Sequence, residues 1–191
     1  KVLALDLDNV LWGGVLGEDG VSGVKISYDF PGNVYRRIQQ RALDLKSSGV
    51  LLVLVSKNNR DDVDEAFSIL SDMPLKLSDF SAICVNWEEK NRNLIGAVER
   101  LGLGLDSFVF VDDNPVECDL IRKMQPDVTV IQVPKDLAYF EDVTLQNAYD
   151  NGSGETLMSS AKPLKDVTAP SGKRGRIFPA MTSAEHGTMT T

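Results

Sequence analysis

The stretch VLALDLD (residues 2–8) opens the chain with a short apolar run that ends in two aspartates, Asp6 and Asp8. A continuous apolar run of this length is typical of a strand that is buried on both faces of a sheet. Carboxylates next to such a strand are costly unless they are paired or bind a metal ion. The stretch therefore predicts a central strand whose carboxyl end presents two acids.

The same alternation of apolar runs and amphipathic segments continues to about residue 143. Further strands are expected over residues 50–55, 81–85, 108–111 and 128–133. Helices are expected from Pro31, over 63–70 and 94–101, from Pro115 and, as a short last helix, over 137–143. This pattern indicates an α/β, Rossmann-like three-layer domain over residues 1–143, with a central parallel sheet covered on both faces.

Residues 144–191 show no lasting helical or strand period. Ser, Thr, Gly and Pro are scattered through them, and the stretch NGSG (residues 151–154) is typical of a flexible linker. We therefore expect a flexible tail or interdomain linker. The basic cluster Lys173, Arg174 and Arg176 is either a solvated part of this linker or a site for an acidic partner.

Composition excludes several classes of function. The net charge of −8 disfavours a general nucleic-acid binder, and no apolar run approaches the roughly 18 residues of a membrane span. The one histidine, His186, leaves no candidate for Ser–His–Asp or Cys–His catalysis. Cys84 and Cys118 form neither a close-spaced metal motif nor a disulfide framework, which indicates a reducing, cytoplasmic location.

Polar residues stand at the ends of three predicted strands. Asp6 and Asp8 follow the first strand, Ser56 follows the second, and Asp112 and Asp113 follow the strand at 108–111. Ligands of open parallel sheets bind at the carboxyl ends of the strands. We therefore expect these side chains at one edge of the sheet.

The two acidic pairs suggest a metal site. Either pair alone is explained equally well as loop acids or as a turn with a helix cap, particularly in DDNP (residues 112–115). Two pairs at the ends of two strands of one sheet instead indicate a single site for a hard divalent cation such as Mg²⁺.

Two further segments contain groups that bind phosphate. Ser56 and the backbone N–H groups of Lys57, Asn58 and Asn59 lie at a strand-to-helix turn, where phosphate oxygens bind. Lys90, at the start of a helix, can neutralise a phosphoryl group and hold the charge of a nucleophile. The alternatives are a helix cap for Ser56 and an ordinary surface lysine for Lys90.

The order of these motifs resembles the haloacid dehalogenase superfamily of phosphatases and phosphotransferases. The motifs are DLD (residues 6–8), Ser56, Lys90 and the pair Asp112 and Asp113, and the resemblance covers about residues 1–143. It implies that Asp6 is the nucleophile, which forms an aspartyl-phosphate, and that Asp8 is the general acid and base.

The resemblance also implies the remaining roles. Ser56 and Lys90 would bind the transferring phosphoryl group. Mg²⁺ would be held by the Asp6 carboxylate, the Asp8 carbonyl and Asp113, with Asp112 as its neighbour. Many members have Thr where this chain has Val10, so one hydroxyl contact is missing here.

Four longer segments look like the FkbH-like subgroup of this superfamily: DLDNVLWGGVLGEDG (6–20), VSKNN (55–59), NWEEKNRNL (86–94) and VDDNPVEC (111–118). The subgroup removes phosphate from an acyl phosphate derived from glycolysis. It loads the three-carbon glyceryl or lactyl unit onto an acyl carrier protein with a phosphopantetheine arm, in polyketide biosynthesis. The short gap between the first two motifs indicates that there is no large cap domain.

The narrower resemblance adds site residues, and alternatives stay open for Trp12 and Cys118. Trp12, Gly13 and Gly14 would line the substrate entrance, although Trp12 is equally well explained as a core aromatic residue. Asn58 would contact the substrate. Cys118 would carry a thioester, or would instead be a small buried residue packed against the sheet.

The leading prediction is a Mg²⁺-dependent enzyme that dephosphorylates a phosphorylated three-carbon metabolite and transfers its acyl unit to a carrier protein. The first alternative is a small-molecule or protein phosphatase of the same superfamily, which uses the same residues. The second is a non-catalytic docking domain that retains the fold.

Overall fold

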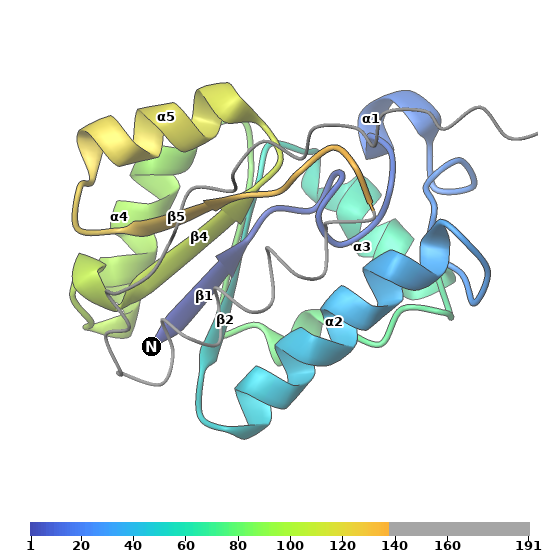
Figure 1. Ribbon diagram of the computed structural model, residues 1–191, viewed down its shortest axis with the longest axis horizontal. Helices are drawn as coiled ribbons and strands as arrows, with labels where there is room; N and C mark the ends of the chain where they lie inside the picture. Colours follow the sequence, from blue (N-terminus) through green and yellow to red (C-terminus); the bar gives the residue numbers. More distant parts are fainter. Residues whose placement is uncertain (138–191) are drawn as a thin grey trace, which may run out of the picture. The chain divides into compact units, whose positions relative to one another are not determined.

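A five-stranded parallel sheet forms the centre of residues 1–137, the part of the 191-residue chain that the computed structural model describes (Figure 1). The strand order is β3-β2-β1-β4-β5, and every neighbouring pair is parallel. The strands are β1 (Val2–Leu5), β2 (Leu51–Ser56), β3 (Ala82–Val85), β4 (Phe108–Asp112) and β5 (Thr129–Gln132). The predicted strands are thus confirmed, with small shifts at their ends.

Helices cover both faces of the sheet. They are α1 (Leu16–Asp19), α2 (Gly32–Ser47), α3 (Arg60–Ile69), α4 (Lys90–Leu101) and α5 (Pro115–Met124), with short 3₁₀ turns at Leu77–Asp79 and Leu105–Ser107. The helices α2 and α3 cover one face and α4 and α5 the other (Figure 1), and their buried side chains belong to two separate apolar cores. The three-layer α/β architecture predicted from the sequence is confirmed.

The β1 strand shows why its sequence is continuously apolar. All four of its residues are buried, with Leu3 and Leu5 in the core beneath α2 and α3. Val2 and Ala4 lie in the core beneath α4 and α5. Because side chains alternate between the two faces of a strand, a strand with helices on both faces needs an apolar residue at every position.

Local signals in the sequence set the helix boundaries. Gly49 and Gly102 follow α2 and α4 with φ angles of 93° and 64°, a left-handed conformation that glycine adopts without steric cost. Asn114 caps α5 through a hydrogen bond from the Val116 N–H, and Pro115 occupies the first turn. The helices α3 and α4 begin three and four residues before the first residues expected from the apolar period, at Arg60 and Lys90.

The segment between β1 and α2 folds back over the end of the sheet. It contains only one helix, the four-residue α1, so the described residues include no large cap domain at this point. The N–H groups of Val10 and Leu11 donate to the Leu7 carbonyl at 3.1 and 2.8 Å, and single bridges join Asp8 to Trp12 and Gly13 to Lys25. This tight turn brings the residues after Asp6 back toward the strand ends.

Gln39 of α2 connects this turn by hydrogen bonds to the segment around Leu75. Its side chain is fully buried, its Nε2 donates to the Leu11 carbonyl at 2.7 Å, and its Oε1 accepts from the Leu75 N–H at 3.1 Å. One side chain therefore satisfies two buried backbone groups that no strand or helix partner satisfies.

Replacing Gln39 with Leu is expected to lower the free energy of unfolding by about 1–3 kcal/mol, because a backbone donor and a backbone acceptor lose their partner. Urea unfolding followed by circular dichroism measures this. Gln40→Leu on the exposed face of the same helix is the matched control, and equal losses in both variants would contradict the assignment.

Two of the predicted segments lie at the C-terminal end of the chain. The last expected helix, over residues 137–143, and the expected tail, 144–191, lie outside the described residues except for Leu137. Among residues 1–137, none of the helices is long and apolar enough to cross a membrane.

Candidate active site

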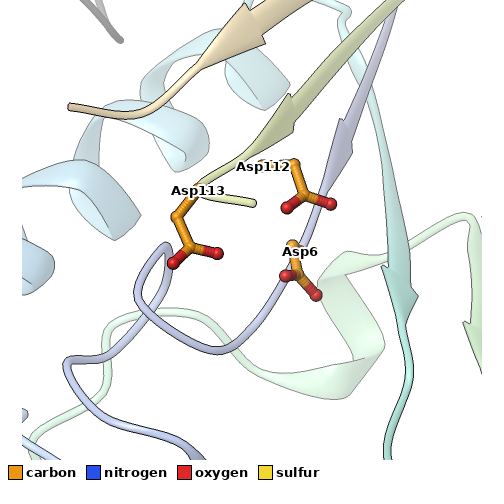
Figure 2. Close-up of side chains that lie close together, drawn as sticks. All are labelled: Asp6, Asp112 and Asp113. Atoms are coloured by element: carbon orange, nitrogen blue, oxygen red, sulfur yellow. The ribbon is translucent and has the colours of Figure 1, made fainter. Parts of the chain in front are cut away.

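Three carboxylates meet at the carboxyl edge of the sheet. Asp6 follows β1, Asp112 ends β4, and Asp113 comes next in the chain; one oxygen from each lies within 4.8 Å of the other two (Figure 2). The strands β1 and β4 pair with Leu5 opposite Val111, and the Asp6 N–H donates to the Val111 carbonyl at 3.1 Å. The parallel register therefore brings the two sequence motifs side by side.

Lys90 neutralises part of this charge. Its Nζ lies 2.8 Å from Asp6 Oδ2 and 2.6 Å from Asp112 Oδ2, and only 4% of the residue is exposed. Burial lowers the pKa of Lys90, but the charges of Asp6 and Asp112 outweigh burial and hold it above its ordinary value. Lys90 is thus a fixed cation in the site rather than a surface lysine.

The pKa values of the three acids are raised in spite of this lysine. Burial raises the pKa of Asp6, and Lys90 opposes this only in part. Burial and the charge of Asp6 raise the pKa of Asp112 to about 7, and the same two causes raise the pKa of Asp113. The pKa values of the three acids are raised mainly because burial disfavours their charged forms, and a bound cation would favour those forms.

The site fits a hard divalent cation. Asp6 Oδ1 is buried and has no hydrogen-bond partner among the described residues, while Asp6 Oδ2 contacts Lys90. In Asp112, by contrast, both carboxylate oxygens have a partner: Oδ2 contacts Lys90, and Oδ1 accepts a hydrogen bond from the Asn114 N–H at 2.8 Å. An unpartnered carboxylate oxygen amid three acids is the environment in which Mg²⁺, with its preference for oxygen ligands, binds.

The raised pKa of Asp112 predicts a pH effect in the metal-free protein. Between about pH 4 and 7 the folded state holds a proton on this carboxyl that the unfolded state has released, so this contribution to stability is lost as pH rises through 7. Thermal melts of the metal-free protein should therefore show Asp112→Asn gaining stability relative to the unsubstituted chain from pH 5 to pH 8. A difference in Tm that does not change with pH would contradict this.

Asp8 is held by three hydrogen bonds. Its Oδ1 accepts from Trp12 Nε1 at 2.9 Å and from the Leu16 N–H at 3.0 Å, and its Oδ2 accepts from Asn58 Nδ2 at 3.0 Å. These bonds fix the direction of a carboxylate that lines the cavity beside Asp6. Such a fixed position suits a group that exchanges protons with a substrate.

Trp12 and Asn58 therefore do not lie where the sequence predicted them. Neither lines the cavity: Trp12 is fully buried with its ring 6.0 Å from that of Phe67, and Asn58 is 4% exposed and also donates to Ser56 Oγ at 3.1 Å. The core alternative for Trp12 is correct. Both residues donate a hydrogen bond to Asp8.

Gly13 and Gly14 likewise do not line the cavity. A Cβ on Gly13 would lie 2.7 Å from the ring of Tyr35, and a Cβ on Gly14 would lie 2.5 Å from Asp19 Oδ2. Gly14 also has a φ of 97°. Close packing and backbone conformation, rather than a substrate entrance, therefore explain these two glycines.

Asn9 is a site residue that the sequence did not single out. It has a φ of 55°, its Nδ2 donates to Asp113 Oδ2 at 3.1 Å, and its Oδ1 accepts from the Gly14 N–H at 2.9 Å. It links the turn after β1 to the acid after β4. The available signal was an asparagine beside the first acids, since asparagine is enriched in the left-handed conformation.

Cys118 lies in the core. It is fully buried and does not line the cavity, and its Sγ contacts the Asp112 carbonyl at 3.6 Å. Burial and the charge of Asp112 raise its pKa to about 12, so the thiol does not ionise near neutral pH. The structure corresponds to the packing alternative and not to a thioester carrier. Cys84 is also buried, as predicted.

A cavity of about 320 Å³ opens over these groups. Five predicted site residues line it: Asp6, Asp8, Ser56, Lys90 and Asp113. Ser56 is 1% exposed at the end of β2. Position 10 is a fully buried valine, which has no hydroxyl group to offer to the site. Lys57, Glu117 and Lys135 also line the cavity. For Lys57 only the backbone N–H was predicted to lie at the site, and the positions of Glu117 and Lys135 were not predicted.

Solved structures resemble this chain. The crystal structure of the N-terminal part of the protein BF1531 from Bacteroides fragilis, described as containing a phosphatase domain complexed with Mg, is 37% identical with a TM-score of 0.72. The match covers 75% of this chain and 38% of that chain, so this chain spans well under half the length of that relative.

Two more distant structures show the fold alone. A haloacid dehalogenase-like family hydrolase from Xanthomonas campestris is 11% identical with a TM-score of 0.51, over 81% of this chain and 94% of that one. An uncharacterized protein from Corynebacterium glutamicum is 13% identical with a TM-score of 0.53, over 79% and 94%. No protein-family model and no curated protein sequence matches this chain.

Proposed function

We propose that this chain, which has the fold of the haloacid dehalogenase superfamily, is a Mg²⁺-dependent phosphatase that takes the phosphoryl group onto Asp6. The observation that carries the proposal is the state of Asp6: a buried carboxylate in a cavity, with one oxygen on Lys90 and the other without a partner among the described residues. A buried carboxylate oxygen that is left without a partner is unfavourable in the folded protein. A divalent metal ion bound to this oxygen would remove this cost.

With Mg²⁺ bound, Asp6 and Asp8 would carry out a two-step displacement. An oxygen of Asp6 attacks the phosphorus of a phosphate ester, and the bond from phosphorus to the leaving oxygen breaks while Asp8 supplies a proton. A water molecule then attacks the aspartyl-phosphate and gives a proton to Asp8. The bond from phosphorus to the Asp6 oxygen breaks, phosphate is released, Asp6 is again a carboxylate and Asp8 again holds the proton that it supplied in the first step. Splitting the reaction in this way is the advantage of a covalent nucleophile.

The remaining residues bind and neutralise the phosphoryl group. Lys90 and the Ser56 hydroxyl lie on the cavity wall beside Asp6 and would contact its oxygens. Bound Mg²⁺ would be held by Asp6, by the Asp8 carbonyl and by Asp113, which lines the cavity, with Asp112 behind it. It would supply charge stabilisation for the phosphoryl oxygens, the main requirement of phosphoryl transfer.

The proposal is tested by phosphate release from p-nitrophenyl phosphate with and without Mg²⁺. Activity that requires Mg²⁺, together with intact-protein mass spectrometry of an acid-quenched reaction that shows one added phosphoryl group, is the expected result. A folded, Mg²⁺-binding protein that releases no phosphate from any ester would favour a docking domain that retains the fold.

A finer proposal concerns the acceptor. The resemblance of four segments to the FkbH-like subgroup supports a chain that takes an acyl phosphate of three carbons and loads its glyceryl or lactyl unit onto an acyl carrier protein. Because Cys118 is buried, the phosphopantetheine thiol itself would attack the acyl carbon: the carbon–sulfur bond forms, the bond from carbon to the phosphate oxygen breaks, and phosphate leaves with the thiol proton. In this reaction Asp6 would not take up the phosphoryl group. A cytoplasmic location suits both that partner and the two free cysteines.

This finer proposal has its own test. The chain is mixed with Mg²⁺, 1,3-bisphosphoglycerate and a phosphopantetheinylated carrier protein, and the carrier is weighed by mass spectrometry. A carrier heavier by one glyceryl group, also with Cys118→Ala, supports direct loading. Phosphate release with an unmodified carrier leaves the phosphatase and contradicts the loading of this unit.

A further inference from the structure

An ion pair on the cavity wall is not used by the steps above. Lys57 follows β2 and Glu117 lies in the first turn of α5; Lys57 Nζ is 2.6 Å from Glu117 Oε1. Both residues line the cavity. The Lys57 side chain is 35% exposed, whereas that of Glu117 is 11% exposed, so the lysine faces solvent more than its partner does.

One carboxylate oxygen of Glu117 has no hydrogen-bond partner among the described residues. The residue as a whole is 8% exposed, and its Oε2 is buried without a hydrogen-bond partner among the described residues. Most buried polar atoms have a partner, so an exception requires an explanation. Mg²⁺ does not provide one, because Glu117 is not part of the group of carboxylates that meet at the strand ends.

The cavity is large enough for a ligand that donates a hydrogen bond to Glu117. Its volume of about 320 Å³ is about ten times the share of one water molecule in the liquid, so there is room beside the transferring phosphoryl group. In the proposed mechanism, the phosphoryl group is contacted by Asp6, Lys90 and Ser56. The Lys57–Glu117 pair is therefore available to contact the rest of the substrate.

We propose that Lys57 and Glu117 form a subsite that selects phosphate esters whose leaving group bears a hydroxyl group. This inference rests on the proposed phosphatase function and specifies its substrate class. A hydroxyl group both donates and accepts, so one such group can donate to Glu117 Oε2 and accept from Lys57 Nζ. The pair then keeps its own contact and the buried oxygen gains its partner.

Other leaving groups are rejected by the same pair. An alkyl group has no donor, so it leaves Glu117 Oε2 without a partner and covers the part-exposed Lys57 side chain with apolar atoms. A carboxylate beside Glu117 brings two like charges together. A site that is built to hydrogen-bond a hydroxyl group discriminates strongly against an analogue that lacks it, because the protein groups are then left unpaired.

The test measures kcat/KM with three phosphate esters: propyl phosphate, 1,2-propanediol 1-phosphate and 1,3-propanediol 1-phosphate, with the full chain and Mg²⁺. We expect one of the two diol esters to exceed propyl phosphate by about tenfold or more. In Glu117→Leu this preference should fall to within about threefold, mainly through KM.

Two further variants keep the test decisive. Asp119→Leu removes a carboxylate from an exposed ion pair with Arg122 on the same helix and should retain the preference. If Glu117→Leu does not fold, Glu117→Gln replaces it. This variant keeps the shape but loses the charged acceptor, and it should show a reduced preference because hydrogen bonds to charged acceptors are stronger.

The outcomes separate this inference from the proposal on which it rests. Equal turnover of all three esters by the unsubstituted chain, or a preference that survives in Glu117→Leu, would overturn the hydroxyl subsite and leave the phosphatase standing. Release of phosphate from none of the three esters, nor from p-nitrophenyl phosphate, would overturn the phosphatase and the subsite with it.

Discussion

Replacing Asp6 with Asn is expected to lower kcat for phosphate release by about 10⁴-fold or more while the protein remains folded. The amide has nearly the same shape as the carboxylate but does not displace a leaving group from phosphorus, so the covalent step is lost. Removing the nucleophile of a covalent enzyme has effects of this size or larger. Release of phosphate from p-nitrophenyl phosphate in saturating Mg²⁺ measures it.

The stability of Asp6→Asn distinguishes a lost nucleophile from a lost fold. Burial raises the pKa of Asp6, which means that the folded protein disfavours its charge, and the neutral amide avoids this cost. The Tm of the metal-free variant should therefore equal or exceed that of the unsubstituted chain. Mg²⁺ should stabilise the variant less, because one ligand is weakened.

Asp119→Asn is the control, since it makes the same chemical change at an exposed position of α5. It should change neither kcat nor the response to Mg²⁺. An Asp6→Asn variant that keeps more than a small fraction of the activity would remove Asp6 from the role of nucleophile. The phosphoryl group would then pass directly to water or to another residue.

Replacing Lys90 with Met has the second largest expected effect, because it acts on both stability and catalysis. Lys90 Nζ lies between Asp6 and Asp112 at 2.8 and 2.6 Å, and all three residues are nearly or fully buried. Without it, two buried carboxylates face each other with no cation between them. Breaking a buried ion pair by removing one partner costs about 3–5 kcal/mol.

The catalytic loss should follow from the same geometry. Lys90 both neutralises Asp6 and, in the proposed mechanism, contacts the phosphoryl oxygens, so kcat should fall by about 10²- to 10³-fold, as when one charge-stabilising donor is removed. Urea unfolding at pH 8 without Mg²⁺ measures the stability, and phosphate release with saturating Mg²⁺ measures the activity.

The stability loss of Lys90→Met should shrink when the pH is lowered to 5, because Asp112, with a pKa raised to about 7, then accepts a proton and no longer repels Asp6. Lys123→Met, at an exposed position of α5, is the matched control and should lose little. A Lys90→Met variant as stable as this control would show that the carboxylates do not depend on the lysine.

The parallel sheet and the edge at which its carboxylates gather could both be predicted from local features of the sequence. Strand β1 is apolar at every position because both of its faces are buried, and the acids at its end are noticeable because charge is costly there. The same reasoning applies to β4 and Asp112. These signals are local in the sequence, and the rule for parallel sheets then brings the strand ends to one edge.

The direction in which each side chain points was decided only by the tertiary structure. The tryptophan at position 12 was assigned equally to an entrance and to the core; its hydrogen bond to Asp8 arises because the turn after β1 folds inward. Cys118 lies in the first turns of α5, as predicted, but faces the sheet, where burial raises its pKa. Periodicity predicts a helix and its apolar face, but it does not show which residues at the edge of that face reach a cavity.

Contacts between residues far apart in the sequence were likewise determined only by folding. Asn9 bonds Asp113 across 104 positions, and Lys57 bonds Glu117 across 60. Neither pair has a sequence motif, because the spacing depends on how many residues the intervening strands and helices contain. The residue types that can hold a metal ion and a phosphoryl group could be found in the sequence, whereas the partners that orient them depend on packing, which only the assembled sheet and helices define.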